Sequence, residues 1–384
     1  MAATLRLADA KSGSRIAVAF PRRHDAPPHE SASQEALARK LAGVLELDFI
    51  EDYRPGEYPP GGVYYVPSRT LVRTVSPQPA EQFIQGIRGD EDLFGGIVPH
   101  AFVATKAITH ALLHPDAAAP EGWSHAFAHD AGPAVLLGIT AFSIGDARLA
   151  GLRLLALGPV RIKPVRASGG RGQILAADRR QLDEALGRQD EDEIAQYGLV
   201  LEEHLQQVET YSVGQARVGG MTVSYAGTQS LTPDNSGLQV YGGSSLLCVR
   251  GGYEELLALP MDANWREAVR LARMYDVAAQ RCYPGLFASR RNYDVARGRD
   301  ARGRIETGVL EQSWRAGGAS FAEACALEAF QNAPERSVVR AYTCERYGNE
   351  HNTPREAQLI YRGDDPETGF ITKYGAVEPH GDPE

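Results

Sequence analysis

Lys163 and the glycine-rich loop after it have residue types suited to binding a phosphate. Lys163 ends a stretch that favours a strand, and Gly169, Gly170 and Gly172 follow within ten residues. Glycine has no Cβ, so backbone N–H groups in such a loop can approach an anion closely, and the lysine adds a point charge that reaches a phosphate oxygen. Basic glycine-rich loops are common, so the meaning of this one depends on acidic residues downstream.

Two of those acidic residues are spaced to converge. Strands are predicted near residues 287–296 and 305–313, joined by a turn at 299–303. Side chains alternate along a strand, so this hairpin places Asp294 beside Glu311. Paired carboxylates with no thiols or histidine cluster nearby favour Mg²⁺, a hard cation that oxygen atoms and phosphates bind. The alternative is that the acids pair with arginines on a solvated sheet surface.

Hydrophobic periodicity predicts the elements that position these residues. A strand–helix–strand pattern in the first 66 residues indicates a small α/β unit up to about residue 100. From Glu209 to Arg250 the pattern indicates about three antiparallel strands. An acidic run at 189–193 is expected to be solvated. Other predicted strands are 14–20, 63–66, 160–164 and 199–205, with a β meander over 337–377; predicted helices are 33–45, 102–113, 143–157, 181–187, 265–282 and 321–330.

Length and composition set the class of protein. A chain of 384 residues is long enough for two or three subdomains, and 43% hydrophobic with 23% charged residues is typical of a globular protein in water. No apolar run is long enough to span a membrane. A net charge of −9 argues against a general nucleic-acid binder. The four cysteines are far apart, which favours reduced thiols in a cytoplasmic protein.

Taken in order, the charged residues resemble the ATP-grasp superfamily over roughly residues 95–333. Lys106 comes first, then Lys163 with its loop, then the strand end Glu202–Leu205 with Glu209, and last Asp294 with the segment 311–318. The complete chain is similar to an uncharacterised bacterial branch of that superfamily, which itself implies no substrate.

The resemblance implies an α+β and α/β architecture, the ATP-grasp fold. Two α+β subdomains would clamp ATP, preceded by a small α/β N-terminal domain. The expected divisions are 1–100 for the N-terminal domain, 101–205 for linker helices and the small subdomain with loop 168–172, 206–335 for the large subdomain with the metal site, and 336–384 for the C-terminal β meander.

The resemblance also implies a role for each matched position. The cofactors would be ATP and Mg²⁺, with Mn²⁺ as an alternative metal. The phosphates would meet the lysines and the loop, the adenine edge would meet the 202–205 strand end, and the ribose would meet Glu209. The expected ATP-binding residues are Lys106, Lys163, Ser168, Gly169, Gly170, Gly172, Glu202, Glu203, Leu205 and Glu209; the metal ligands are Asp294, Glu311 and Ser313; the catalytic cations are Arg290 and Arg315.

Two departures from the family pattern affect the metal site. Ser313 stands where the family usually has an asparagine, so a water, Gln312 or Asn292 would have to replace that ligand. The position two residues before the metal aspartate is Asn292 instead of the frequent arginine, so the cation would come from Arg290 or Arg315.

The implied function is a ligase that uses ATP to activate a small-molecule or peptide carboxylate as an acyl phosphate for attack by an amine. The alternatives are an ATP-grasp kinase and a catalytically inactive nucleotide-binding module or sensor, which the serine at position 313 supports. The expected partners are small carboxylate and amine substrates, with no nucleic acid and no membrane. The oligomeric state stays open, a homodimer being one alternative.

Overall fold

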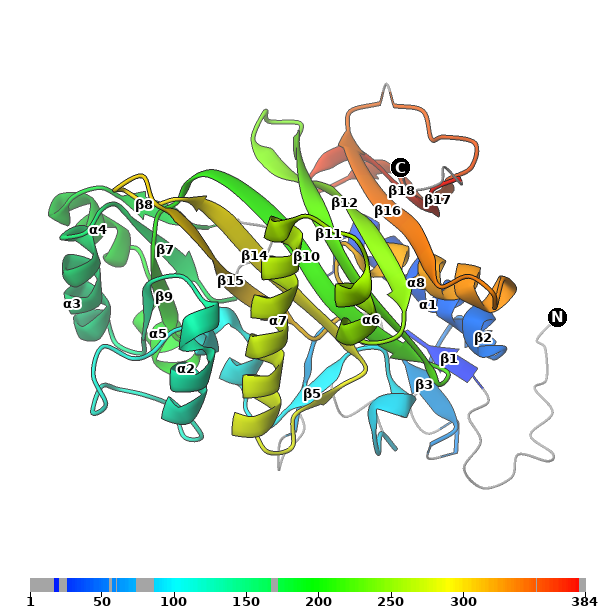
Figure 1. The fold of residues 1–384 in the computed structure, drawn as a ribbon, viewed down its shortest axis with the longest axis horizontal. Helices are drawn as coiled ribbons and strands as arrows, with labels where there is room; N and C mark the ends of the chain where they lie inside the picture. Colours follow the sequence, from blue (N-terminus) through cyan, green and yellow to red (C-terminus); the bar gives the residue numbers. More distant parts are fainter. Residues whose placement is uncertain are drawn as a thin grey trace.

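The computed structural model describes residues 17–20, 26–54, 57–59, 61–73, 86–166, 172–349 and 351–379. These residues form four sheets with helices packed between and around them, as Figure 1 shows. The expected mixed α+β architecture is therefore confirmed. No helix in the described ranges is long and apolar enough to cross a membrane.

The N-terminal part is the small α/β unit expected from the sequence. Its three strands pair in parallel in the order β2-β1-β3, and helix α1 packs beside them. The helix starts at Pro28, earlier than the expected 33, because proline suits the first helical turn, where its missing N–H removes no bond. The elements are β1 (Ala17–Ala19), α1 (Pro28–Leu45), β2 (Asp48–Ile50) and β3 (Val63–Tyr65).

A second small sheet, in the order β13-β5-β4, connects this unit to the middle of the chain. In it a late strand, β13, pairs with the early strand β5. The two halves of the chain are thus joined by backbone bonds as well as by packing. The strands are β4 (Leu71–Val72), β5 (Gly96–Val98) and β13 (Phe287–Ala288), and the 3-10 helix η1 (Asp90–Asp92) lies between β4 and β5.

Residues 138–203, part of the expected small subdomain, contain a four-stranded antiparallel sheet in the order β6-β9-β7-β8. The strand predicted at 160–164 is confirmed. The acidic run 189–193 is largely exposed, as expected, and it also begins a helix, because Asp190 caps that helix and acids are favourable in its first turn. The elements are β6 (Gly138–Ala141), α3 (Ile144–Leu155), β7 (Val160–Pro164), β8 (Ile174–Ala176), α4 (Arg179–Leu186), α5 (Glu191–Tyr197) and β9 (Leu199–Glu203).

The largest sheet has eight strands in the order β15-β14-β10-β11-β12-β16-β18-β17. The three strands predicted after Glu209, the hairpin and the C-terminal meander are all confirmed. The meander continues the same sheet, so the division expected at 335–336 crosses a continuous structure. The strands are β10 (Gln206–Val218), β11 (Met221–Pro233), β12 (Gln239–Arg250), β14 (Arg290–Arg299), β15 (Ile305–Ser313), β16 (Val338–Tyr347), β17 (Gln358–Asp365) and β18 (Gly369–Val377).

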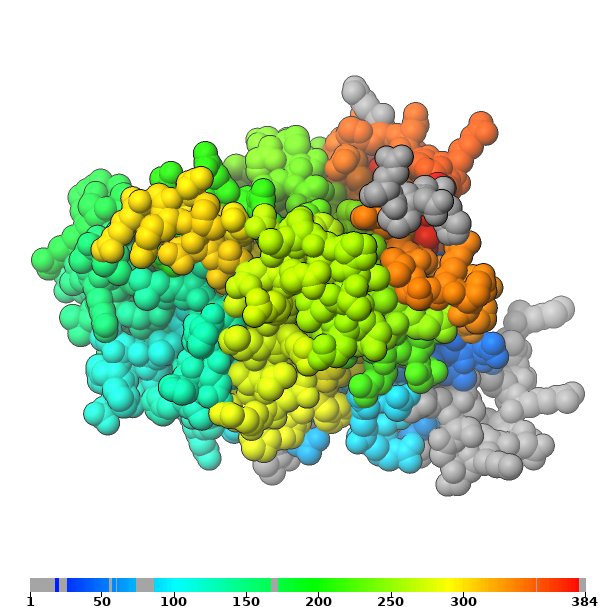
Figure 2. Space-filling view, in the orientation of Figure 1, coloured from blue at the N-terminus to red at the C-terminus, as the bar shows by residue number. Residues whose placement is uncertain are grey.

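Different helices cover the two faces of this sheet. One face carries α7, whose Asp276 accepts a hydrogen bond from Tyr293 at 2.5 Å. The other carries α8, whose Glu323 accepts from Tyr225 at 2.7 Å, and α1 packs against α8. Figure 2 shows α6 and α7 filling the middle of the first face. The helices are α6 (Tyr253–Ala258), α7 (Ala263–Cys282) and α8 (Ser320–Asn332).

The helix predicted at 102–113 is wrong. Two short 3-10 helices, η2 (Ala101–Ala104) and η3 (Lys106–Thr109), stand there instead. Thr105 separates them: its backbone is extended, and its hydroxyl bonds the carbonyl of Phe102 and the amide of Ala107. Such local side-chain bonds compete with a continuous helix. The chain then enters α2 (His125–Ala131) and η4 (Gly132–Ala134) before β6.

Candidate functional site

The glycine-rich loop is only partly described by the structure. Ser168, Gly169 and Gly170 lie outside the described residues. Gly172 is described and has a φ of +70°, a conformation that glycine adopts without strain. The expectation that the loop closes over a phosphate therefore stays a prediction.

Lys163, at the end of β7, forms part of a buried charged cluster. Its ammonium pairs with one oxygen of Glu202 on β9, and Nε2 of His110 donates to the other oxygen at 3.0 Å. The exposed fractions are 4% for Lys163 and 2% for both Glu202 and His110. The ring of His110 lies over Gly138, where a Cβ would come within 2.6 Å of it. These three side chains are named the buried triad below.

The buried triad changes the picture of Lys163 and Glu202. Burial disfavours the ionised form of Glu202, but the charge of Lys163 and then the hydrogen bond from His110 outweigh it and lower the pKa of Glu202 to about 2. Lys163 therefore has a protein partner in addition to the phosphate expected from the sequence. His110 was missed, because it lies 92 residues from Glu202 and no periodicity links them.

Glu203 follows Glu202 in β9, so its side chain points to the opposite face of the sheet. Glu203 accepts the amide of Leu137 at 2.9 Å, and burial raises the pKa of its carboxyl. The backbone amides of Glu203 and His204 already donate to Leu137 and Pro159. Those two donors are therefore not the ones that would meet an adenine edge. Leu205 is buried, whereas Glu209 is exposed and accepts a 2.6 Å hydrogen bond from Tyr211.

A small cleft lies on that opposite side of the strand end, where α3 ends near Glu203, His204 and the hairpin turn 300–304. Lys163, Asp294 and Glu311 do not line it. We therefore do not identify this cleft with the phosphate site.

The structure brings Asp294 and Glu311 together as expected. They are directly opposite each other in the β14–β15 hairpin, next to an irregularity in the register. Asp294 accepts bonds from Asn292 at 3.0 Å and Gln229 at 2.7 Å. Its pKa is raised to about 6 by burial and by the charge of Glu311. A cation placed between the two carboxylates would offset the charge of Glu311 and lower the pKa of Asp294 again.

Lys106 contacts this pair from η3. Its Nζ lies 2.8 Å from Oε2 of Glu311, and the lysine is almost completely buried. Two residues expected in different roles, a phosphate ligand and a metal ligand, are therefore in direct contact. One positive charge thus already compensates part of the carboxylate pair.

Arg290 does not fit the catalytic role expected for it. Its exposed fraction is 1%, and it forms an ion pair with Glu323, which is 0% exposed, with Nη2 2.6 Å from Oε1. Its Nη1 donates to the carbonyls of Ser313 and Arg315 at 3.2 and 2.6 Å. Because these donors are engaged inside the protein, we interpret Arg290 as a residue that positions the segment after β15.

Arg315 differs from Arg290. It is half-buried, donates to the carbonyl of Ala316 at 2.9 Å, and no ion pair is found for it with the described residues. Burial lowers the pKa of its guanidinium, while the charge of Glu311 opposes that change. It stays charged at neutral pH because the ordinary arginine pKa is far above 7. Of the two expected catalytic cations, this is the one able to meet a ligand.

The metal ligand that Ser313 leaves missing is not replaced by Gln312 or Asn292. Gln312 points to the α7 face, where it bonds Tyr275 and the carbonyls of Val103 and Thr105. The oxygen of Asn292 already accepts from Ser212 and Tyr225. Within the described ranges, no three His, Cys, Asp or Glu side chains gather as a metal site. Two carboxylates and a hydroxyl are what the hairpin offers a cation.

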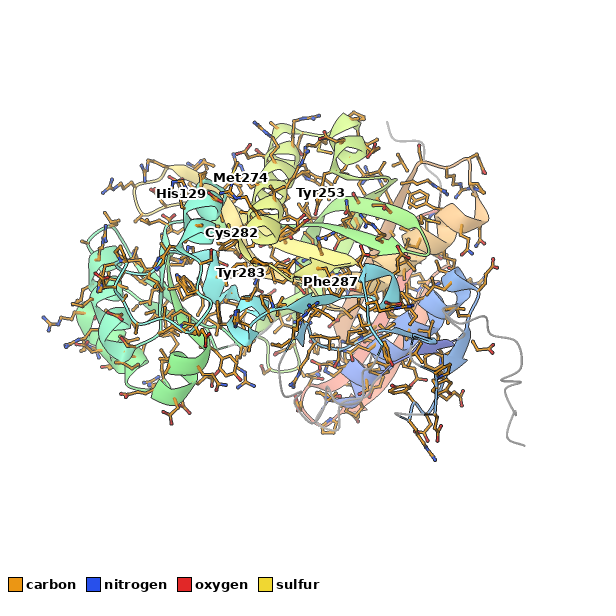
Figure 3. All side chains as sticks on the ribbon, turned by 90° about the horizontal axis from the view of Figure 1, so that it is seen from below. His129, Tyr253, Met274, Cys282, Tyr283 and Phe287 are labelled. Atoms are coloured by element: carbon orange, nitrogen blue, oxygen red, sulfur yellow. The ribbon has the colours of Figure 1, made fainter. Side chains whose placement is uncertain are left out.

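Trp314, next to Arg315 in the sequence, and the contact between α2 and α7 have structural positions. Trp314 is buried and donates to the hydroxyl of Tyr293 at 3.3 Å, so it packs in the core. His129 lies on α2 beside the C-terminal end of α7, where Figure 3 labels it with Cys282 and Tyr283. Cys282 donates to Asp130 at 3.5 Å. These contacts hold α2 on α7.

The chain belongs to the family described as "Protein of unknown function (DUF3182)", whose model matches residues 17–375. No curated protein sequence matches it.

Several solved structures are similar to this chain at low identity. A carboxyaminoimidazole ribonucleotide synthase from Aspergillus clavatus, complexed with ATP, is 13% identical, with 95% of this chain and 94% of that chain covered and a TM-score of 0.47. A biotin carboxylase–β-γ-ATP complex from Campylobacter jejuni is 9% identical, with 94% and 87% covered and a TM-score of 0.48. D-alanyl-alanine synthetase A from Vibrio cholerae is 11% identical, with 78% and 89% covered and a TM-score of 0.41. Because these values are low, function is inferred below from the residues of this chain.

Proposed function

We propose that this protein is an ATP- and Mg²⁺-dependent ligase that joins a carboxylate to an amine through an acyl phosphate. The observation that carries the proposal is the pairing of Asp294 with Glu311 across one hairpin, with Lys106 against Glu311. The raised pKa of Asp294 indicates a place for an additional cation. The match of residue order to the ATP-grasp superfamily supports ATP as the source of the phosphoryl group.

Asp294 and Glu311 would hold the metal, with the hydroxyl of Ser313 beside them. When bound, Mg²⁺ would neutralise charge on the β- and γ-phosphates. Lys106 and Lys163 would add positive charge to the phosphates from the small-subdomain side. Residues 101–205 and 206–335 would thus contribute opposite sides of one ATP site.

Arg315 would hold the substrate carboxylate next to the γ-phosphate. A carboxylate oxygen then attacks the γ-phosphorus, the bond to the β,γ-bridging oxygen breaks, and ADP leaves. An amine nitrogen next attacks the acyl carbon, the bond from that carbon to the phosphate oxygen breaks, and phosphate leaves while the nitrogen loses a proton. Such catalysis depends on positioning and charge neutralisation and requires no protein nucleophile. A cytoplasmic protein with small carboxylate and amine substrates fits this scheme.

A second candidate is a nucleotide-binding module without turnover. The observation that favours it is that both lysines already have carboxylate partners, Glu202 for Lys163 and Glu311 for Lys106. Ser313 in place of an amide ligand points the same way. This module would bind ATP but would release no ADP.

Thermal unfolding with ATP–Mg²⁺, without ligand, and with NAD as a different nucleotide for comparison tests the nucleotide site. A ligand bound only by the native state adds about 2.7 kcal/mol at 100 times its dissociation constant, so a clear increase in Tm is expected with ATP–Mg²⁺. An increase with NAD and none with ATP–Mg²⁺ would refute the proposal. ADP release on adding carboxylic acids and amines then separates the ligase from the module, because only the ligase releases ADP.

A further inference from the structure

Each carboxylate of the metal pair already has one oxygen engaged by the protein. In Asp294, Oδ1 accepts hydrogen bonds from Asn292 at 3.0 Å and from Gln229 at 2.7 Å. In Glu311, Oε2 lies 2.8 Å from the ammonium of Lys106. In the part of the chain that the structure describes, no hydrogen bond or ion pair engages Oδ2 of Asp294 or Oε1 of Glu311. One oxygen of each acid is therefore left for a ligand.

These two remaining oxygens belong to side chains on one face of the hairpin. Asp294 is directly opposite Glu311, and the neighbouring pair sets Ser313 opposite Asn292. Directly opposed residues of antiparallel strands share a face, as do residues two apart. The hydroxyl of Ser313 accepts from Arg290 at 3.3 Å and keeps a second lone pair. Two carboxylate oxygens and a hydroxyl suit one Mg²⁺, which usually completes its coordination with water and phosphate oxygens.

Lys106 is fixed at the metal pair by the backbone on either side of it. Gln312, in β15 next to the acid that the lysine contacts, donates to the carbonyl of Thr105 at 2.7 Å. At the other end of η3, the hydroxyl of Thr109 bonds Tyr275 at 3.1 Å, and Tyr275 donates to Gln312 at 2.9 Å. The lysine is 6% exposed. Its ammonium is therefore a built part of the site, unlike that of a lysine on the surface.

The position of this ammonium limits how many metal ions the site can bind. Phosphoryl-transfer sites use one or two divalent cations. A second cation would need the oxygen of Glu311 that the ammonium holds, and the two positive charges would repel each other. Two carboxylates and one ammonium leave a single negative charge, which one divalent cation exceeds. The surplus positive charge would then face the phosphates.

We propose that Lys106 takes the place of a second metal ion, so that the site binds a single Mg²⁺ through Asp294, Glu311 and Ser313. An ammonium has three N–H donors, so Lys106 can keep its contact with Glu311 and also donate to a phosphate oxygen. This inference rests on the proposed function, because ATP supplies the phosphates that complete the metal site.

The number of bound metal ions is counted with Mn²⁺, whose free ion gives an EPR signal that is lost on binding. The protein is saturated with the non-hydrolysable ATP analogue AMP-PNP and titrated with Mn²⁺, so the readout does not depend on turnover. We expect one Mn²⁺ per chain, bound about tenfold or more tightly than by AMP-PNP alone. Two Mn²⁺ per chain would overturn the inference. An affinity equal to that of AMP-PNP alone would also overturn it, because the carboxylates would then supply no ligand.

The variant Lys106→Met tests whether the lysine is what excludes a second metal ion. It removes the ammonium and releases the second oxygen of Glu311, so the count should rise to two Mn²⁺ per chain. The matched control is Lys40→Met, which removes another buried lysine with a carboxylate partner, Glu328 at 2.6 Å, between α1 and α8. The control should keep a count of one. A count of one in Lys106→Met would show that this lysine does not replace a metal ion.

The count on the unaltered protein keeps the inference testable even if Lys106→Met does not fold, because two Mn²⁺ overturn it there. Calorimetric titration with AMP-PNP separates this inference from the proposed function. If the analogue does not bind, the proposed function fails and the inference fails with it. If the analogue binds together with two Mn²⁺, only the single-metal inference fails.

Discussion

The two sides of the proposed ATP site are organised by opposite electrostatics. On the small-subdomain side, the buried triad joins unlike charges, and the pKa of Glu202 falls to about 2. On the large-sheet side, Asp294 and Glu311 are like charges in direct register, and the pKa of Asp294 rises to about 6. The first side is balanced without any ligand. The second is compensated only in part by Lys106 and reaches balance when a cation is added.

The difference indicates that one side would bind phosphate and the other would bind the metal. A balanced, buried cluster is preorganised, so Lys163 keeps its position before a phosphate arrives. The pKa of Asp294 is raised partly by the charge of Glu311, and a metal bound between the two carboxylates would offset that repulsion. Removing the charge of Lys163 should therefore lower stability, whereas removing the charge of Asp294 should retain or increase it.

The largest effect is expected from Lys163→Met. It leaves Glu202 charged and without its cation inside the protein, which should lower the free energy of unfolding by about 3–5 kcal/mol. Adding Glu202→Gln should restore most of the stability, while ATP affinity stays low because the phosphate has lost its lysine. Denaturant unfolding and calorimetric ATP titration measure the two quantities. A Lys163→Met protein as stable as the unaltered one would refute the balanced-cluster interpretation.

Glu311→Gln should lower metal-dependent turnover by about 10²–10³-fold, the loss typical of removing one preorganised electrostatic group. It should also reduce stability, because Lys106 loses its 2.8 Å partner. Asp294→Asn is the matched change, since it relieves the same repulsion and keeps the Lys106 contact. It should lower turnover with stability retained or increased. Equal destabilisation by both variants in thermal melts would contradict this difference between the two carboxylates.

His110→Phe should have a smaller effect, confined to the small-subdomain side. It keeps a ring over Gly138 and removes the hydrogen bond to Glu202, a loss of about 1.5–3 kcal/mol for a bond to a charged group. The pKa of Glu202, measured by NMR, should rise in the variant. An unchanged pKa would show that His110 only fills space.

The pH dependence of stability should separate the two sides by sign. Glu202 has a lowered pKa, so its contribution is present above the unfolded value near 4.5 and is lost as pH falls toward about 2. Asp294 has a raised pKa, so stability falls as pH rises from the unfolded value near 3.8 toward about 6. Each effect is at most about 1.4 kcal/mol per pH unit. Comparing unfolding curves of Asp294→Asn and unaltered protein isolates the second; a variant with the same slope between pH 4 and 6 would refute it.

Local patterns predicted the carboxylate pair better than the buried ion pairs that join different elements. The carboxylate pair follows from alternation along two strands joined by a short turn, so Asp294 opposite Glu311 was readable from the sequence. The partners of Lys163 and Arg290 were not, because Glu202 and Glu323 lie 39 and 33 residues away and packing between elements selects them. The helix predicted at 102–113 does not form as one helix, because the Thr105 hydroxyl bonds the backbone of Phe102 and Ala107, which the apolar periodicity does not reveal. Periodicity assigns a face, whereas pairing across the core depends on the whole fold.

The contact between the first helix and the last sheet edge affects how the protein is made. Helix α1 packs against α8, and the amide of His29 donates to Asp365 of β17 at 3.2 Å across 336 residues of sequence. During synthesis, the apolar stripe of α1 leaves the ribosome long before β17 exists. Contacts of such high sequence separation form late and slowly. The apolar face of α1 should therefore stay exposed until nearly the whole chain has been synthesised. A ribosome stalled before residue 358 would hold a nascent chain that depends on chaperones.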